Sequence, residues 1–146
     1  MTKVTRNSLF NRMDRNGDGQ VDGGETVEVR RETMTSQALA GNLMGNPTER
    51  TVYVLLPPGY ATSDRRYPVV YVMPWRHGHP LENAGGFKRT MEWLLRNDEI
   101  EEMIVVIPDG ICKLQGGLFL SCSTLADYET YATQEVFFYV DTHYGT

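Results

Sequence analysis

Apolar residues from position 34 onward fall in short blocks, and the composition of each block predicts an element. Residues 51–56 are β-branched, aromatic or leucine and end at a Pro-Pro-Gly turn, which is typical of a strand. Residues 67–73 and 103–107 are almost wholly apolar, a pattern that favours strands buried on both faces, as in a parallel sheet. Residues 34–40 predict a weaker first strand.

Two segments have helical spacing instead. Residues 87–97 place four apolar side chains on one face, and residues 128–144 repeat such a pattern. Strands that alternate with helices indicate βαβ units with helices on the faces of the sheet. The fold class predicted for residues 31–146 is therefore α/β, with about four mostly parallel strands. Ligands of such sheets bind beyond the carboxyl ends of the strands, here within residues 74–86 and 109–125.

Residues 14–25, near the start of the chain, have a different pattern. Oxygen-bearing side chains stand at loop positions 1, 3, 5, 9 and 12, and Gly19 stands at position 6, which is the spacing of an EF-hand calcium loop. Gly19 permits the sharp turn, because a residue without Cβ tolerates a positive φ. The expected ligands, with Gln20 acting through its backbone carbonyl, are Asp14, Asn16, Asp18, Gln20, Asp22 and Glu25.

The alternative interpretation of this segment is a solvated acidic turn, since turns are also rich in Asp, Asn and Gly. A terminal Glu25 and an apolar Val21 are not needed by a turn and favour the calcium loop. Residues 8–13 predict a short entering helix, whereas the β-branched exit, residues 26–31, predicts a poor helix. We therefore expect an EF-hand-like unit over residues 1–30, with one structural Ca²⁺ site.

Bulk composition excludes some classes of function. The 146 residues are 40% hydrophobic and 23% charged and carry a net charge of −5. No basic patch is present to neutralise phosphates, so we expect no nucleic-acid partner. No apolar run approaches the roughly 20 residues that span a bilayer, so we expect no membrane partner, and no signal peptide is visible.

Two cysteines, Cys112 and Cys122, lie in one predicted loop and are either a disulfide pair or free thiols. The pair and the calcium loop are compatible with an extracellular or periplasmic parent protein, but they leave localisation undecided. Candidate hydrolytic side chains are also scattered: Ser121, Ser123, Asp141 and His143. Asp141 and His143 stand two apart on a predicted helix and do not face each other, which argues against a catalytic triad.

The blocks of the second segment, in their order, resemble the N-terminal half of the esterase D-like, feruloyl-esterase-like family of α/β-hydrolases. The resemblance covers about residues 35–146. The blocks that carry it are GNPTERTVYVLLPPGY at 45–60, RYPVVYV at 66–72, IVVIPDG at 104–110 and DYETY at 127–131.

The resemblance implies carboxylic ester hydrolysis by a serine nucleophile in a G-x-S-x-G turn. In that family a His-Gly loop after the strand at residues 67–73 supplies oxyanion donors, which makes His77 and Gly78 the candidate oxyanion loop here, displaced by three residues. No G-x-S-x-G pentapeptide occurs in this chain, and the family's acid and base come later still. No catalytic nucleophile, acid or base is therefore assigned.

These observations lead to two expectations of function. The first is a truncated calcium-binding esterase-family protein, which is inactive alone and whose parent takes an ester substrate. The second is a non-catalytic calcium-binding or interaction module on a hydrolase-like scaffold. In the family's sheet the nucleophile strand lies beside residues 67–73, so its absence would leave an apolar edge unpaired, and we expect self-association through that edge.

Overall fold

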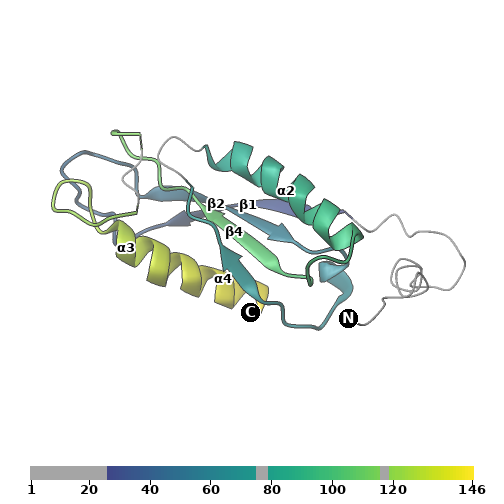
Figure 1. Cartoon of the computed structure of the whole chain (residues 1–146). Helices are drawn as coiled ribbons and strands as arrows, with labels where there is room; N and C mark the ends of the chain where they lie inside the picture. Colours follow the sequence, from purple (N-terminus) through teal and green to yellow (C-terminus); the bar gives the residue numbers. More distant parts are fainter. Residues whose placement is uncertain (1–25, 75–78, 116–118) are drawn as a thin grey trace, which may run out of the picture.

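The computed structural model describes residues 26–74, 79–115 and 119–146, and a four-stranded sheet forms its centre (Figure 1). In spatial order the strands are β1 (Glu28–Thr35), β2 (Glu49–Leu56), β4 (Ile104–Pro108) and β3 (Val69–Tyr71). Helix α2 (Pro80–Arg96) covers one face of the sheet. The other face is covered by a helix with three parts: α3 (Tyr128–Thr130), the π-helical turn η2 (Tyr131–Glu135) and α4 (Val136–Tyr144).

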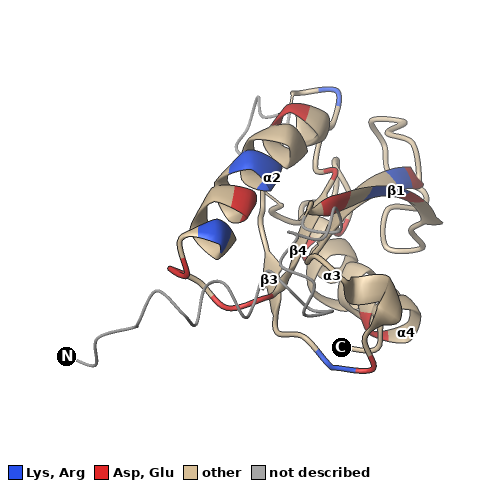
Figure 2. Ribbon diagram, turned by 90° about the vertical axis from the view of Figure 1, so that its right-hand side faces the viewer, with Lys and Arg blue, Asp and Glu red and all other residues tan. Residues whose placement is uncertain are grey.

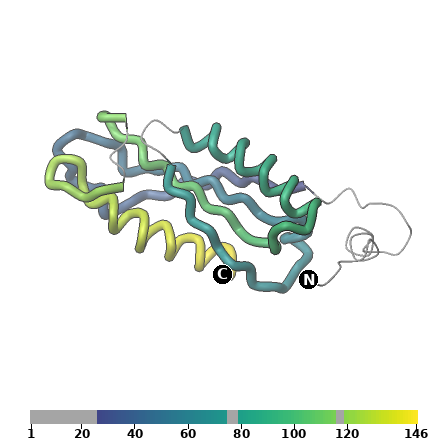
Figure 3. The backbone as a smooth tube through the Cα atoms, in the orientation of Figure 1, coloured from purple at the N-terminus to yellow at the C-terminus, as the bar shows by residue number. Residues whose placement is uncertain are grey.

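Strand directions correct the predicted sheet. β1 pairs antiparallel with β2, and β2 pairs antiparallel with β4, so β3 and β4 form the parallel pair. The prediction of a mostly parallel sheet is wrong. Two parallel strands need a long crossover connection between them. Here the crossover contains α2 and joins β3 to β4 (Figure 3).

Strand β1 was not recognised in its true position. The predicted strand at residues 34–40 is wrong, since β1 ends at Thr35 and a turn follows. Charged side chains at Glu28, Arg30, Arg31 and Glu32 hide the strand from a search for apolar blocks. β1 instead forms because each of its residues has a partner in β2, from Glu28 with Leu56 to Thr35 with Glu49. The doubt about a helix over residues 26–31 is confirmed.

The two apolar strands differ in their surroundings. β4 is buried along its whole length, as predicted. The expectation of double burial is wrong for residues 67–73, because β3 is three residues long, lies at the edge of the sheet, and leaves Val70 44% exposed. Among the described strands, β3 has a neighbour on one side and none on the other.

Successive side chains of a strand point to opposite faces of the sheet, so the strands contribute to two cores. One core lies between the sheet and the helix of residues 128–144. It contains the strand residues Val52, Val54, Ile104 and Val106 and the helix residues Tyr128, Tyr131, Val136, Val140 and Tyr144. The other core lies under α2 and packs Ala84 and Met91 on the strand residues Tyr53, Leu55, Val105 and Ile107. α2 begins seven positions before the predicted residue 87, with Pro80 in its first turn, where a missing N–H costs nothing.

The predicted helix over residues 128–144 is confirmed, and it contains a π-helical turn at Tyr131–Glu135. At the end of that turn the Glu135 carboxylate accepts the backbone N–H groups of Gln37 and Ala38, both at 2.9 Å, and the Ser36 hydroxyl. The helix is thereby tied to the turn that follows β1. In the part of the chain that the structure describes, no helix has the length and apolarity needed to cross a membrane.

Candidate active site

The candidate site lies where the parallel strands β3 and β4 end at the same edge of the sheet. The chain leaves β3 through Val72, whose N–H donates to the Val106 carbonyl at 2.8 Å, and it leaves β4 after Pro108. Two connections start there, toward α2 and toward α3, and this edge is where α/β proteins bind ligands. Residues 75–78 and 116–118 of these connections are not described.

The exit from β4 is a tight turn. The Asp109 N–H donates to the Thr51 carbonyl at 2.9 Å, and the Asp109 carboxylate accepts the Ile111 N–H at 2.8 Å. The residue after Asp109 is Gly110, and glycine fits there because an added Cβ would lie 2.4 Å from the ring of Phe119. The Phe119 ring therefore packs directly against Gly110, just beyond the end of β4.

A buried arginine lies beneath this turn. Arg50 at the start of β2 is 2% exposed. Its guanidinium donates to the Ile111 carbonyl and to the Tyr128 hydroxyl, both at 2.7 Å, and lies 3.8 Å from the Asp109 carboxylate. The planar fork of an arginine suits several acceptors at fixed angles. Arg50 thus joins β2, the exit from β4 and the first turn of α3.

This centre is under-satisfied in hydrogen bonds. Arg50 Nε, Asn46 Nδ2 and the Tyr131 hydroxyl are buried and have no partner among the described residues. Burial is the main cause that raises the pKa of Tyr131 and also that of Tyr128, where the charge of Arg50 acts in the opposite direction. Both phenols are consequently neutral at ordinary pH, so the charges at this centre are those of Arg50 and Asp109, which balance each other.

Asp127 fixes the start of α3. Its carboxylate accepts the Ser121 hydroxyl at 2.6 Å and the N–H and hydroxyl of Thr130 at 3.0 and 2.7 Å. The hydrogen bond from Ser121, followed by those from Thr130, lowers the pKa of Asp127. The Ser121 oxygen in turn accepts the Glu129 N–H at 3.0 Å. Ser121 is therefore a helix-capping residue, and no histidine among the described residues forms a hydrogen bond with it.

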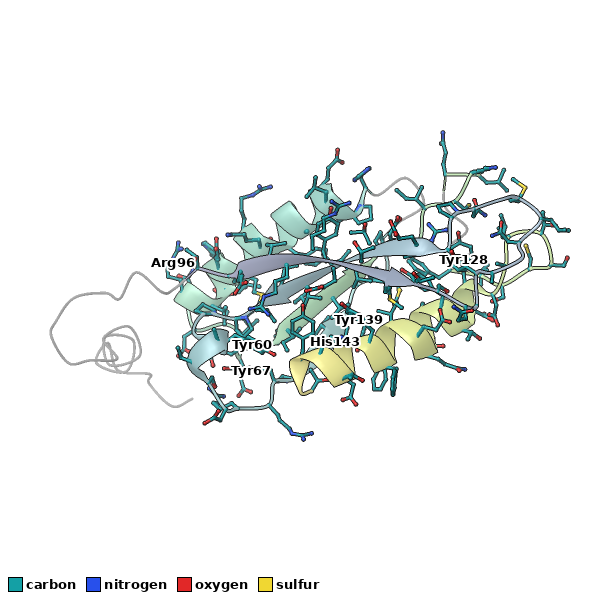
Figure 4. All side chains as sticks on the ribbon, turned by 180° about the vertical axis from the view of Figure 1, so that it is seen from behind. Tyr60, Tyr67, Arg96, Tyr128, Tyr139 and His143 are labelled. Carbon is teal, nitrogen blue, oxygen red and sulfur yellow. The ribbon has the colours of Figure 1, made fainter. Side chains whose placement is uncertain are left out.

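The scattered candidate triad is not assembled. His143 lies in the last turn of α4, where Nδ1 is 2.7 Å from the Tyr139 carbonyl and the ring stacks on Tyr139 at 4.1 Å. Ser121 caps the opposite end of the helix, where it accepts the Glu129 N–H. Figure 4 labels Tyr128 near that end and His143 near the other. The Asp141 carboxylate accepts the Thr146 hydroxyl at 3.2 Å. Ser121, Asp141 and His143 thus make separate local contacts, and no hydrogen bond joins any two of them.

The two most specific predictions from the sequence fall outside the described residues. His77 and Gly78, the candidate oxyanion loop, are not described, and the chain resumes at His79, the N-cap of α2. The six expected calcium ligands are not described either: Asp14, Asn16, Asp18, Gln20, Asp22 and Glu25. Among the residues that are described, no three His, Cys, Asp or Glu side chains gather to hold a metal.

The cysteines are both free thiols, Cys112 buried and Cys122 exposed. The Cys122 sulfur accepts the Leu125 N–H at 3.3 Å within the loop that leads to α3. Sequence reasoning missed Arg50, Asp109 and Glu135, which organise the region. The sequence did contain a signal for Arg50, because this arginine directly precedes the apolar run of a strand. An arginine that is buried there needs a partner such as a carboxylate.

Comparison with known proteins assigns the family. Residues 44–146 match the family described as "Putative esterase". The chain belongs to this esterase family. No curated protein sequence matches the chain. The matched segment includes β2, both parallel strands and both covering helices, so the α/β-hydrolase scaffold accounts for almost everything the structure describes.

Solved structures agree with the esterase assignment. A ferulic acid esterase is 25% identical with a TM-score of 0.65, over 82% of this chain and 45% of its own. The feruloyl esterase module from Clostridium thermocellum, in complex with sinapinate, is 18% identical with a TM-score of 0.59, over 82% and 37%. An S-formylglutathione hydrolase from Agrobacterium tumefaciens is 17% identical with a TM-score of 0.61, over 82% and 45%. The esterase-family chain thus spans less than half of each of these proteins.

Proposed function

We propose that this chain is part of a carboxylic ester hydrolase that works by acyl transfer to a serine lying outside these 146 residues. The observation that carries the proposal is the family match over residues 44–146, which ends among the described elements without a G-x-S-x-G turn. The chain would supply the parallel pair β3–β4 and the loops at its carboxyl edge.

In this proposal His77 and Gly78 present backbone N–H groups to the oxyanion of the tetrahedral intermediate. Donors placed where charge develops in the transition state are a large source of rate acceleration in acyl transfer. Arg50, Asp109 and Phe119 would hold the neighbouring turn at the exit of β4 in place. The likeness to feruloyl esterases and to an S-formylglutathione hydrolase supports esters, with thioesters as the second class to assay.

The test of the missing nucleophile uses the chain as it is. With 4-nitrophenyl acetate we expect no turnover above the buffer rate, and with a fluorophosphonate probe we expect no labelled serine. A matched pair, Ser121→Ala and Ser123→Ala, should leave both results unchanged. Clear hydrolysis that one of these substitutions abolishes would overturn the proposal. If the coding sequence beyond Thr146 lacks a G-x-S-x-G turn within a few dozen codons, a non-catalytic module is favoured instead.

We propose as well that residues 14–25 bind one Ca²⁺ through Asp14, Asn16, Asp18, Gln20, Asp22 and Glu25. The chemistry of the donor set supports this, because hard carboxylate, amide and carbonyl oxygens at this spacing are what calcium prefers. Glu25 would close the site with both carboxylate oxygens. The ion would hold residues 1–25 together and fasten them to Val27, which is fully buried beside α2.

Titration calorimetry tests the calcium site. We expect Glu25→Gln to weaken Ca²⁺ binding by at least about tenfold, since half of a bidentate ligand loses its charge. Glu28→Gln is the matched control, because Glu28 is exposed in β1 and pairs with Arg30 at 2.8 Å. Calcium should also raise the melting temperature of the parent chain by linkage. Equal affinity for the parent chain and Glu25→Gln would remove Glu25 from the site.

The remaining proposal concerns partners. The 146-residue chain self-associates through the outer edge of β3, where the described strands leave a neighbour missing. Size-exclusion chromatography over a range of concentrations tests this. An elution volume that does not change with concentration, together with a monomer mass, would refute it.

A further inference from the structure

The start of the described chain is fastened under a helix. Val27 is fully buried and belongs to the same core as Met91 of α2. Its backbone N–H donates to a carboxylate oxygen of Glu92 at 3.1 Å. The beginning of β1 and the C-terminal half of α2 therefore lie at the same end of the molecule, as Figure 1 shows.

Glu92 is one of the charged residues of both signs along α2, which Figure 2 shows in red and blue. Its carboxylate lies 3.7 Å from the ammonium of Lys88, one turn earlier, and its side chain is 16% exposed. A hydrogen bond that a carboxylate accepts is stronger than one between neutral groups. The C-terminal half of α2 is thus held on the sheet by apolar packing and by this charge-assisted bond to Val27.

Val27 follows closely on the segment proposed to bind calcium. Glu25, the last of the six expected ligands, stands two positions before it. Two residues span at most about 7 Å, so a Glu25 carboxylate that binds Ca²⁺ does so close to the hydrogen bond between Val27 and Glu92. Without the ion, Glu25 adds a second negative charge beside that of Glu92, and like charges at such distances repel each other.

We infer that Ca²⁺ bound at residues 14–25 clamps α2 to the sheet, with Glu92 as the positioning residue that transmits the effect. The inference rests on the proposed calcium site and on no part of the ester chemistry. In the ion-free chain, repulsion between Glu25 and Glu92 weakens the hydrogen bond to Val27. Ca²⁺ neutralises Glu25 and fixes the chain just before Val27, so the bond to Glu92 is kept.

The clamp acts on the helix that follows the candidate oxyanion loop. α2 has 17 residues and begins at Pro80, with His79 as its N-cap. A helix of that length is about 25 Å long. His77 and Gly78 directly precede His79 in the chain. Calcium at one end of α2 therefore stabilises the helix that supports the loop at its other end.

Hydrogen exchange of the 146-residue chain tests the clamp. With saturating Ca²⁺ we expect the amides of residues 88–96 to exchange at least about threefold more slowly, and those of residues 136–144 to change less. Glu92→Ala should abolish the slowing in α2. Because coupling between two sites is reciprocal, this substitution should also weaken Ca²⁺ binding, measured by titration calorimetry, by about the factor by which the ion slows exchange.

Two further variants separate the link from a loss of charge. Glu99→Ala is the matched control, since Glu99 is exposed just beyond α2 and removes the same charge without touching Val27. It should keep the slowing, and its Ca²⁺ affinity should stay within about twofold of that of the parent chain. Glu92→Gln keeps an acceptor for the Val27 N–H but ends the repulsion, so α2 should already exchange slowly without the ion.

The outcomes distinguish the clamp from the calcium site itself. A chain that binds no Ca²⁺ in the calorimeter overturns both. Binding without slower exchange in α2, or with equal slowing in α2 and α4, overturns the clamp and leaves the calcium site standing. Slowing that survives Glu92→Ala, or that Glu99→Ala also abolishes, overturns the role of Glu92. Melting curves of each variant confirm that the fold is kept, and Glu92→Gln decides the matter if Glu92→Ala does not fold.

Discussion

The two faces of the sheet are held by different kinds of contact. The face under the helix of residues 128–144 is fastened by polar side chains. Arg50 bonds to Tyr128, the Glu32 carboxylate accepts the hydroxyls of Tyr139 and Tyr144 at 3.1 and 2.6 Å, and Glu135 caps the turn after β1. The α2 face packs Ala84 and Met91 on apolar strand residues, with a polar link from the Val27 N–H to Glu92 at 3.1 Å.

This difference matters for the candidate site. Hydrogen bonds to charged groups have preferred angles and distances, so they fix the position of what they join. Apolar contacts are non-directional, and side chains of similar volume replace one another at small cost. The start of α3 and the exit of β4 are therefore held in place from one face, whereas the position of α2 depends mainly on packing volume, with Glu92 as its polar link.

The largest expected effect is on the polar face. Arg50→Met should lower the free energy of unfolding by about 3 kcal/mol, because the Tyr128 hydroxyl, the Ile111 carbonyl and the Asp109 carboxylate lose their shared donor. Urea unfolding followed by circular dichroism measures this. Arg65→Met is the control: Arg65 is 68% exposed and pairs with Glu102 at 2.7 Å, so its loss should cost less than about 1 kcal/mol. A loss for Arg50→Met no larger than for the control would contradict the network.

The α2 face should respond to volume instead of chemistry. Met91 is 4% exposed, so Met91→Ala should cost about 2 kcal/mol, while Met91→Leu should cost less than about 1.5 kcal/mol. On the other face Arg50→Lys keeps the charge but loses the planar fork of the guanidinium. The free energy of unfolding of this variant should therefore remain well below that of the parent chain. If Met91→Leu and Arg50→Lys were equally well tolerated, the distinction between the faces would not hold.

A smaller effect is expected at Tyr144. Burial, and then the hydrogen bond to Glu32, raise the pKa of this phenol. Tyr144→Phe should cost about 1 kcal/mol at neutral pH. A raised folded-state pKa gives stability that is complete below the unfolded value of about 10 and is lost as pH rises through the folded value. The difference between Tyr144→Phe and the parent chain should therefore shrink above about pH 10, and a constant gap would refute the assignment.

The smallest effect is expected at Asp127, which is exposed. Its pKa is lowered chiefly by the hydrogen bonds from Ser121 and Thr130. The stability it gives is present above the unfolded pKa of about 3.9 and is lost as pH falls through the folded value. Asp127→Asn should melt below the parent chain at pH 7, and the two should converge as the solution is acidified. Asp141→Asn, at the other end of the helix, is the matched control.

Sequence patterns predicted the elements that are wholly apolar or strongly periodic. β4 and β2 stand where they were expected, since their burial leaves a nearly uninterrupted apolar signal. The helix of residues 128–144 was predicted from its periodicity, because one face is buried and the other is exposed. β1 was misplaced because its stability comes from pairing with β2, and a charged edge strand has no such signal. Strand direction was predicted wrongly for the same reason. It depends on which strands are neighbours in the sheet, and a block of apolar residues does not show which strand it will pair with.

The location of the candidate site follows from strand order, but the contacts within it do not. Parallel strands point their carboxyl ends to one edge, so residues 74–86 and 109–125 were identified from strand order alone. Arg50 and Asp109 are 59 positions apart, and nothing local in the sequence shows that they approach to 3.8 Å. Glu135 meets Gln37 and Ala38 for a similar non-local reason.

The π-helical turn at Tyr131–Glu135 constrains how the sequence can change in length. A π turn holds one residue more than an α turn, so deleting one exposed residue there, such as Thr133, would restore an α-helix. The turn would still close once about the axis, so the residues downstream would keep their faces: Val140 and Tyr144 would stay against the sheet, and Tyr144 would still reach Glu32. A deletion within the regular α-helical part would instead rotate everything downstream by about 100° about the helix axis. The helix therefore tolerates the loss of a single codon better at this turn than in α4.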